Sequence, residues 1–231
     1  NMTIKEIDMR FVHRYKTWLS EIYPPQKSNY ANKALQSIYS LMKYAHQSQY
    51  IDSNPVQYME YFPNKVKPKI YLTAQEVERL EAFELPQKSL ERVRDLFLWQ
   101  CYTGMDYSTM SEFKEDFIKQ SQMGLYIDGN RIKSSTRYVL PFFDKAQRIW
   151  NKYGKSLPII SNQKYNTYLK AVIEMAGINK PITSHSGRKT FANLFESKGI
   201  DRRTIADMLG HKKVEVTLKH YSEVQIEGIF T

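Results

Sequence analysis

A histidine and an arginine in the C-terminal part of the chain are spaced to act on one ligand. His185 and Arg188 stand three residues apart, and Thr183 and Ser184 before them are helix-capping residue types. In a helix that begins near Ser184, both side chains leave the same face one turn apart. An imidazole and a guanidinium fork on one face suit a phosphate group. Taken alone, such a pair is more often a capping histidine beside a solvated arginine.

Three further polar residues in this part of the chain have types that could complete a reaction: Lys133 beside an expected hairpin, His211 directly after Gly210, and Tyr221. A tyrosine can act as a nucleophile, but its ordinary pKa of about 10 requires a base or a positive field to remove the proton. A lysine ammonium can protonate a leaving oxygen. Each residue is weak evidence by itself, since a histidine after a helix stop is usually structural and the chain has 17 tyrosines.

The order and spacing of these residues resemble the tyrosine recombinase (phage integrase) family. The matching strings are Thr183-Ser-His-Ser-Gly-Arg188, Ile205-Ala-Asp-Met-Leu-Gly-His211 and Thr217-Leu-Lys-His-Tyr221. In the family, a His-x-x-Arg helix is followed by a Leu-Gly-His turn and then by the nucleophilic tyrosine, and a lysine lies on a β-hairpin. The resemblance extends to the front of the chain, where a helical region, a linker and Tyr71-Leu-Thr-Ala-Gln-Glu76 look like the core-binding domain and the start of the catalytic domain.

The resemblance implies cleavage and rejoining of DNA strands without a metal or another cofactor. Tyr221 is expected to attack the phosphodiester and form a 3′-phosphotyrosine, while Lys133 protonates the leaving 5′-oxygen. Arg188 is expected to hold the phosphate oxygens, with hydrogen bonds from His185 and His211 and with His185 assisting removal of the tyrosine proton. Because the phosphotyrosine conserves the bond energy, another strand can reseal it, as integration or excision of a mobile element requires.

One family position is changed. The family has an arginine after a Thr-Gly-apolar turn and an acidic residue three positions later, whereas the turn at Thr103 is followed here by Asp106 and Thr109. A carboxylate that faces a phosphate is repulsive, so Asp106 must point away, pair with a cation or mark an inactive site. Since the other family positions are intact, we expect a divergent but coherent subfamily. Arg131 or Arg137 could supply the missing charge, although two solvated hairpin arginines are the more ordinary interpretation.

Apolar periodicity predicts a small helical domain at the N-terminus. Apolar residues from Phe11 to Ile22 recur at helical spacing and end before Pro24-Pro25, and a second stripe predicts a helix over about 28–47. The stretch from Pro63 to Lys69 holds two prolines and three lysines, the composition of an extended linker. The predicted organisation is a helical, SAM-like core DNA-binding domain over 1–62, a linker over 63–70 and a catalytic domain over 71–231.

The second block is predicted to be mostly helical. Thr73 and Glu76 have the spacing of a capping box, and the stripe from Leu90 to Cys101 predicts a longer helix that ends at Gly104. From Trp150 onward the pattern is helical again. Further caps and stops are expected at Asp201, Gly199 and Gly210.

A small sheet interrupts these helices. Asp128-Gly129 stands between β-rich runs, which is typical of a hairpin turn, so strands are expected at 125–127 and 131–133, with a further extended run at 137–140. The predicted fold class is therefore mainly α with a small antiparallel β-sheet, in two domains.

The charge balance favours a polyanionic partner. The chain has 34 Lys and Arg against 24 Asp and Glu, a net charge of +10. Half of this excess lies between Ile178 and Tyr221, which hold nine basic and four acidic residues. We therefore expect double-stranded DNA as the partner. The candidate phosphate contacts are Lys27, Lys33, Lys43, Arg131, Arg137, Arg202, Arg203, Lys212 and Lys213, each of which is by itself as readily a solvated side chain.

Composition also argues against several classes of protein. The apolar runs are far shorter than the roughly 20 residues needed to span a bilayer, and the first twenty residues lack the pattern of a secretory signal. The single cysteine, Cys101, cannot form an intrachain disulfide, which suits a reducing cytoplasm. We expect a cytoplasmic protein without membrane contact, associated with the nucleoid when bound.

Other functions remain open at this point. A cleavage-inactive DNA-binding regulator would keep the fold, with Asp106 as its mark. A type IB topoisomerase would share the chemistry. A metal-dependent nuclease has little support, since His, Asp and Glu do not cluster at ligand spacing.

The resemblance also implies a mode of assembly: a monomer in solution and a homotetramer on paired DNA sites, with accessory DNA-bending proteins as further candidate partners. The apolar residues after Tyr221 could dock on a neighbouring subunit or pack on their own domain. The resemblance leaves open an arm-binding domain ahead of residue 1, which many integrases carry.

Overall fold

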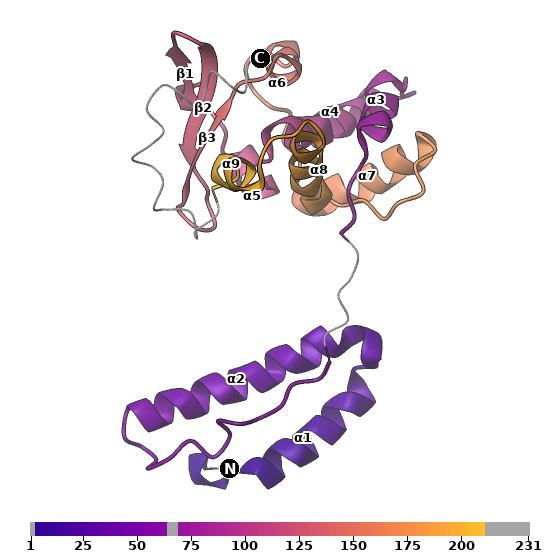
Figure 1. Cartoon of the computed structure of the whole chain (residues 1–231). Helices are drawn as coiled ribbons and strands as arrows, with labels where there is room; N and C mark the ends of the chain where they lie inside the picture. The colour runs from indigo at the N-terminus through magenta and orange to yellow at the C-terminus, as the bar shows by residue number, and fades with distance from the viewer. Residues whose placement is uncertain (1–2, 64–68, 211–231) are drawn as a thin grey trace. The chain divides into compact units, whose positions relative to one another are not determined.

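The chain divides into two compact units, residues 1–68 and 69–231, each with its own hydrophobic core. The structure is a computed structural model that describes residues 3–63 and 69–210 (Figure 1). Among these residues, no helix combines the length and the apolar character that crossing a bilayer requires.

The first unit is a pair of helices that lie side by side (Figure 1). They are α1 (Met9–Ile22) and α2 (Ser28–Gln47), with short 3₁₀ turns η1 (Ile4–Glu6) and η2 (Pro25–Lys27) before each of them. Both helices were predicted from periodicity and are confirmed. The Asp8 carboxylate caps α1 by accepting a hydrogen bond from the backbone N–H of Phe11 at 2.8 Å. The core between the helices is built from Ile7, Val12, Leu19, Ala31, Leu35, Met42, Val56 and Met59.

The segment after α2 returns along both helices. Asn32 on α2 exchanges two hydrogen bonds with the backbone of Phe62, at 2.9 and 2.8 Å. Lys16 on α1 donates to the carbonyl oxygen of Glu60 at 3.0 Å. These contacts tie the end of the first unit to its own helices.

The second unit is mainly helical and carries one small sheet, as predicted. Its elements are α3 (Ala74–Ala82), α4 (Lys88–Thr103), α5 (Tyr107–Ser111), η3 (Glu115–Phe117), β1 (Ile118–Ser121), β2 (Gly124–Asn130), β3 (Arg137–Pro141), α6 (Asp144–Lys152), α7 (Asn162–Met175), α8 (Ser184–Ser197) and α9 (Arg202–Met208). Several of the predicted caps are confirmed. Thr73 and Glu76 form the capping box of α3, Gly104 ends α4 with a φ of +66°, and Asp201 caps α9.

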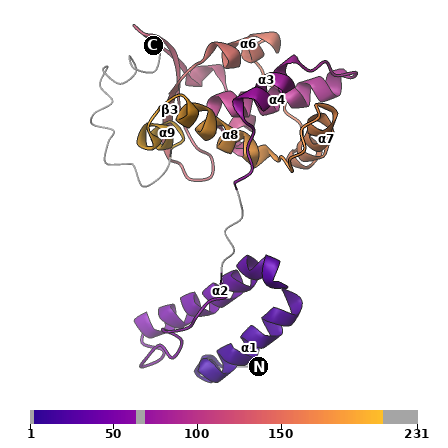
Figure 2. The ribbon, with the colours of Figure 1, turned by 45° about the vertical axis from the view of Figure 1, so that its right-hand side comes forward.

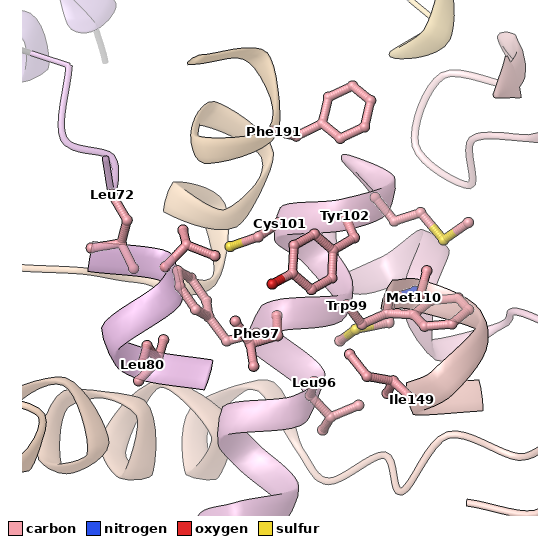
Figure 3. Close-up of a cluster of buried hydrophobic side chains, with 14 of the residues drawn as sticks. Leu72, Leu80, Leu96, Phe97, Trp99, Cys101, Tyr102, Met110, Ile149 and Phe191 are labelled. Carbon is pink, nitrogen blue, oxygen red and sulfur yellow. The ribbon is translucent and has the colours of Figure 1, made fainter. Parts of the chain in front are cut away.

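Helix α4 lies at the centre of this unit and packs against α3, α6, α7 and α8 (Figure 2). Its second half is buried on every side, which is why the apolar stripe widens there to residues on all faces of the helix. Figure 3 shows Phe97, Trp99 and Cys101 of α4 within the core, with Phe191 of α8 beside them. The buried Gln100 side chain satisfies the hydrogen bonds of two neighbours, donating to the Met105 carbonyl at 3.0 Å and accepting from the Tyr165 hydroxyl at 2.8 Å.

Helix α8 crosses α4 closely because Gly187 has no side chain at the crossing. A Cβ atom at Gly187 would lie 2.6 Å from the Cβ of Gln100. Next to this crossing, the Thr190 hydroxyl accepts a hydrogen bond from the backbone N–H of Leu72 at 3.0 Å. Because α8 lies so close to α4 at Gly187, the next residue, Arg188, is held near the C-terminal end of α4.

The sheet is antiparallel in the order β1-β2-β3, but its turns lie elsewhere than predicted. Asp128-Gly129 is not a turn: both residues lie inside β2 and pair with Val139 and Tyr138 of β3. The Asp128 carboxylate is instead held by a cross-strand partner, the Arg137 guanidinium, at 2.8 and 2.5 Å. A cross-strand ion pair of this kind favours a ladder position over a turn.

The connection between β2 and β3 is longer than a tight hairpin. It spans 131–136, so the strand predicted at 131–133 is wrong. The loop is closed by hydrogen bonds from Arg131 N to Thr136 O at 2.9 Å and from Ser135 N to Arg131 O at 2.8 Å.

The predicted start of the following helix at Trp150 is also wrong. Helix α6 begins at Asp144, because Ala146, Ile149 and Trp150 share one buried face and the helical period starts ahead of the tryptophan.

Candidate active site

Arg188 is a buried cation that links two turns. It lies in the first half of α8, whose N-terminus is capped by Thr183 through a capping box with Ser186. Its Nη1 donates to the carbonyl oxygen of Gly104 at 2.9 Å, and its Nη2 donates to the carbonyl oxygen of Leu209. The guanidinium thus joins the Thr-Gly turn after α4 to the Leu-Gly turn after α9.

The guanidinium of Arg188 still has hydrogen-bonding capacity. Each Nη atom carries two hydrogens, and one from each is enough for the two carbonyl groups. Burial, and next the positive charge of Arg131, lower the pKa of Arg188 to about 10, with Asp106 acting in the opposite direction. Arg188 is therefore a cation at neutral pH, in a position that favours a further anionic partner.

Asp106, which follows the Thr-Gly turn after α4, is paired with a cation. Its Oδ2 accepts a hydrogen bond from Nη2 of Arg131 at 2.8 Å. Its Oδ1 caps α5, accepting from the Thr109 N–H at 3.0 Å, the Thr109 hydroxyl at 3.1 Å and the Ser108 hydroxyl at 2.7 Å. Burial acts to raise the pKa of Asp106, but the hydrogen bonds from Arg131, Ser108 and Thr109 outweigh it and lower the pKa. The sequence left three possibilities for Asp106: it points away, pairs with a cation or marks an inactive site. The structure shows that it pairs with a cation.

A small pocket brings these charges together. It is lined by Thr103, Gly104, Met105, Thr109, Arg131, Tyr138, Arg188 and Met208. Sequence reasoning missed Met105, Tyr138 and Met208. These residues carry no chemical signal in the sequence. Met105 follows Gly104 in the turn after α4. Tyr138 and Met208 reach the pocket through the packing of β3 and α9, which lie beside each other (Figure 1 and Figure 2).

His185 precedes Arg188 by one turn on α8, and its side chain is partly covered by the protein and partly exposed to solvent. Partial burial, and next the charges of Lys189 and Arg188, lower its pKa, with a smaller lowering effect from Lys133 and an opposing effect from Asp106. The imidazole is therefore neutral at pH 7 and can accept a proton. The exposed Lys133 lies in the β2–β3 connection, within electrostatic range of this histidine.

The other candidate DNA contacts are spread over both units. Lys27, Lys33 and Lys43 are exposed in the first unit, and Arg202 and Arg203 are exposed at the start of α9. Arg202 is paired with Glu196 at 2.6 Å.

Arg137 does not join Arg131, Arg188 and Asp106 at the pocket, since it is paired with Asp128 on the sheet. His211, Tyr221, Lys212 and Lys213 lie outside the described residues, as does the apolar segment after Tyr221.

No group of three or more His, Cys, Asp or Glu side chains is arranged to hold a metal ion in the part of the chain that the structure describes. The charged groups around the pocket are instead suited to an anion. Two guanidinium groups and one carboxylate leave a net positive charge there.

Comparison with known proteins shows which family the chain belongs to. The model of the Phage integrase family matches residues 70–227. The chain belongs to the phage integrase family. This confirms the resemblance inferred from the strings that hold His185, Arg188, His211 and Tyr221.

Curated relatives in this family match part of the chain. An integrase/recombinase of Escherichia coli is 36% identical over 67 residues, which are 29% of this chain and 20% of that protein. Tyrosine recombinase XerD of Bifidobacterium longum is 34% identical over 104 residues, 45% of this chain and 32% of that protein. Tyrosine recombinase XerC of Syntrophus aciditrophicus is 22% identical over 222 residues, covering 85% of this chain and 70% of that protein. The chain thus spans only a fifth to a third of the first two relatives.

Solved integrase structures share the fold. The Tn1549 transposon integrase in complex with circular intermediate DNA matches with a TM-score of 0.69 and 14% identity, covering 99% of this chain and 86% of that one. A lambda integrase dimer bound to a COC′ core site matches with a TM-score of 0.67 and 18% identity, covering 100% of this chain and 80% of that one. A lambda integrase tetramer bound to a Holliday junction matches with a TM-score of 0.65 and 19% identity, covering 92% and 65%. The predicted fold class is confirmed.

Proposed function

We propose that this chain is a DNA recombinase that breaks and rejoins strands through a covalent link to Tyr221, in the integration or excision of a mobile element. The observation that carries the proposal is the buried, net positive pocket in which Arg188 and Arg131 meet at the ends of α4 and α9. A buried cation without a full set of partners favours an anion, and a phosphodiester has the matching charge.

The reaction that fits these groups is an exchange of phosphate esters. The Tyr221 oxygen attacks phosphorus, the bond between phosphorus and the 5′-oxygen breaks, and the 3′-phosphate stays on the tyrosine. The phenol proton passes to a base, and the leaving 5′-oxygen takes a proton from Lys133. In the reverse step the 5′-hydroxyl of another strand attacks the phosphotyrosine and releases Tyr221. No net oxidation, hydrolysis or external energy source is needed.

His185 is the proposed base. Its lowered pKa keeps the imidazole neutral at pH 7, and the cations that lower it also stabilise negative charge on a transferred phosphate. We also propose that His211 donates a hydrogen bond to that phosphate. This assignment rests only on the family's Leu-Gly-His string.

We propose that the first unit is a core DNA-binding domain and that both units contact the duplex through their basic residues, in the cytoplasm at the nucleoid. Relatives in complex with DNA include a dimer and a tetramer. We extend this to a homotetramer of this chain on paired sites, assembled from monomers with accessory DNA-bending proteins as further partners. Affinity for DNA should then fall steeply with salt concentration.

A nicked suicide substrate tests the proposed function. The DNA segment bound in the native genome is recovered with the protein, and a nick is placed so that the short cleaved strand diffuses away and religation cannot occur. The wild-type chain should form a protein–DNA adduct that survives denaturation, and Tyr221→Phe should form none. An adduct that persists in Tyr221→Phe contradicts the assignment.

A second candidate, a cleavage-inactive DNA-binding regulator, is favoured by one observation, the carboxylate of Asp106 at the position of the family arginine. Its neutralisation by Arg131 weakens that argument. Salt-sensitive binding of the recovered DNA with no adduct under any condition would establish the regulator and refute the recombinase.

A further inference from the structure

We propose that Arg131 contacts the scissile phosphate in place of the arginine that the family has at position 106, and that Asp106 is its positioning residue. The inference rests on the proposed function and deepens it. It assigns the role of one family arginine to a residue from a different element, the β2–β3 connection.

Asp106 is built as a rigid platform. Three donors from the first turn of α5 fix Oδ1, at 2.7, 3.0 and 3.1 Å, which leaves Oδ2 for Arg131 at 2.8 Å. The Asp106 residue as a whole is 7% exposed. A carboxylate held in this way cannot turn toward solvent, so it draws the guanidinium of Arg131 into the pocket.

Arg131 reaches the pocket with donors to spare. Its backbone is held at the loop ends by Thr136 and Ser135, and its side chain is 19% exposed. One of its five N–H groups is used on Asp106. Its buried Nε–H has no acceptor among the residues that the structure describes. A buried donor without an acceptor is costly in a native structure, so this N–H is available to an acceptor atom on a ligand.

Arg131 and Arg188 are close enough to repel each other. The charge of Arg131 lowers the pKa of Arg188, and both residues line the same pocket. Asp106 offsets only one of the two positive charges. A pocket with a surplus cation and a free donor favours an anion, and a non-bridging phosphate oxygen supplies both the charge and the acceptor.

The test compares three variants of the full chain on the suicide substrate. Arg131→Ala should lower the rate of adduct formation by about 10²–10³-fold, the usual effect of losing one donor to a developing charge. The double variant Arg131→Ala with Asp106→Asn removes both charges, so it no longer buries an unpaired carboxylate. If Arg131 contacts the phosphate, the double variant stays as slow as the single one. If Arg131 only neutralises Asp106, the double variant recovers. Arg92→Ala, an exposed arginine at the start of α4, is the matched control and should keep the wild-type rate.

A methylphosphonate at the scissile position gives a readout that a structural role would not move. This group carries a methyl in place of one charged oxygen, so it no longer needs the second guanidinium. The deficit of Arg131→Ala relative to wild type should shrink to about tenfold or less on this substrate. An unchanged deficit overturns the assignment, whatever the stability of the variant.

Inorganic phosphate provides a test that needs no cleavage. Phosphate should raise the thermal midpoint of the wild-type chain and of Arg92→Ala by a ligand-linked increment, and this increment should be lost in the double variant. An equal increment in all three proteins overturns the proposal even if the chain proves to be a binding regulator. Absence of an adduct from wild-type protein together with a lost phosphate increment would refute the recombinase while keeping the anion site.

Discussion

The left-handed turn at Gly104 should tolerate a methyl group much less well than a matched turn elsewhere in the same unit. Gly104 ends α4 with a φ of +66°, and Gly154 follows α6 with a φ of +60°. An alanine pays a similar backbone cost at both, about 1–2 kcal/mol for the left-handed conformation. The two sites differ in what the added Cβ would meet. At Gly154 nothing lies within 4 Å, whereas at Gly104 the Cβ would overlap the Cδ2 atom of Leu209 and lie 3.1 Å from the Phe191 ring.

The difference between the two variants isolates the packing contribution. Overpacking of a buried site costs about 1–3 kcal/mol, so Gly104→Ala should lose about 2–5 kcal/mol of unfolding free energy and Gly154→Ala about 1–2. Relief of the overlap requires movement of Leu209, whose carbonyl oxygen accepts a hydrogen bond from Arg188. Gly104→Ala should therefore also slow adduct formation, while Gly154→Ala should not.

Denaturant unfolding followed by tryptophan fluorescence measures this difference. Trp99 and Trp150 are buried in the second unit, and Trp18 is exposed in the first, so a Trp18→Phe background restricts the signal to the second unit. Equal losses for the two variants would refute the packing of the α4 turn against Leu209 and Phe191. A normal adduct rate in a destabilised Gly104→Ala would refute the link between this turn and Arg188.

Three further predictions address the groups around the pocket. If neutral His185 is the base, the adduct rate should fall as the pH drops below about 6.5, which gives the pH–rate profile an acid limb. Lys189→Gln removes a cation that lowers the His185 pKa, so this variant should move the acid limb to higher pH. An acid limb that does not move argues against His185. Gln100→Leu should lower the free energy of unfolding by about 2–5 kcal/mol, because it leaves the two buried partners of Gln100 without this hydrogen bond. Gln163→Leu, at an exposed position, should change that free energy by no more than about 0.5 kcal/mol. Equal effects of the two substitutions in denaturant unfolding would contradict the role of the Gln100 hydrogen bonds. The folded pKa of Asp106 lies below its ordinary 3.8, so its stabilising effect is complete above that pH and is lost as the pH falls further. Wild type should therefore lose more stability than Asp106→Asn between about pH 4 and pH 2 in acid titrations. Parallel curves would contradict the shift.

The parts of the fold that depend on local signals could be predicted from the sequence. The capping box at Thr73, the left-handed stop at Gly104 and the cap at Asp201 each depend on a few neighbouring residues. The capping residues Thr183 and Ser184 predicted the start of α8, and the three-residue spacing predicted that His185 and Arg188 lie one turn apart on it. These features carry their physical cause within one or two helical turns.

The parts that depend on contacts between distant residues could not be predicted. Asp128-Gly129 has the composition of a turn, but Arg137 on the opposite strand holds Asp128 in the ladder. The pairing of Asp106 with Arg131 joins residues that are 25 positions apart. Arg131 and Arg137 lie at the two ends of the β2–β3 connection, and the sequence does not distinguish them. The path of this connection places Arg131, and not Arg137, at the pocket.

The most direct measurement is the site of the covalent link to DNA. Trypsin cleavage after Lys219 releases a peptide that begins at His220, and Tyr221 is the one tyrosine among residues 220–231. After reaction with the suicide substrate and nuclease digestion, mass spectrometry should find this peptide carrying a nucleotide on the Tyr221 oxygen through its 3′-phosphate. A nucleotide on any other residue, or a DNA strand cut by wild-type protein with this peptide unmodified, would contradict the account.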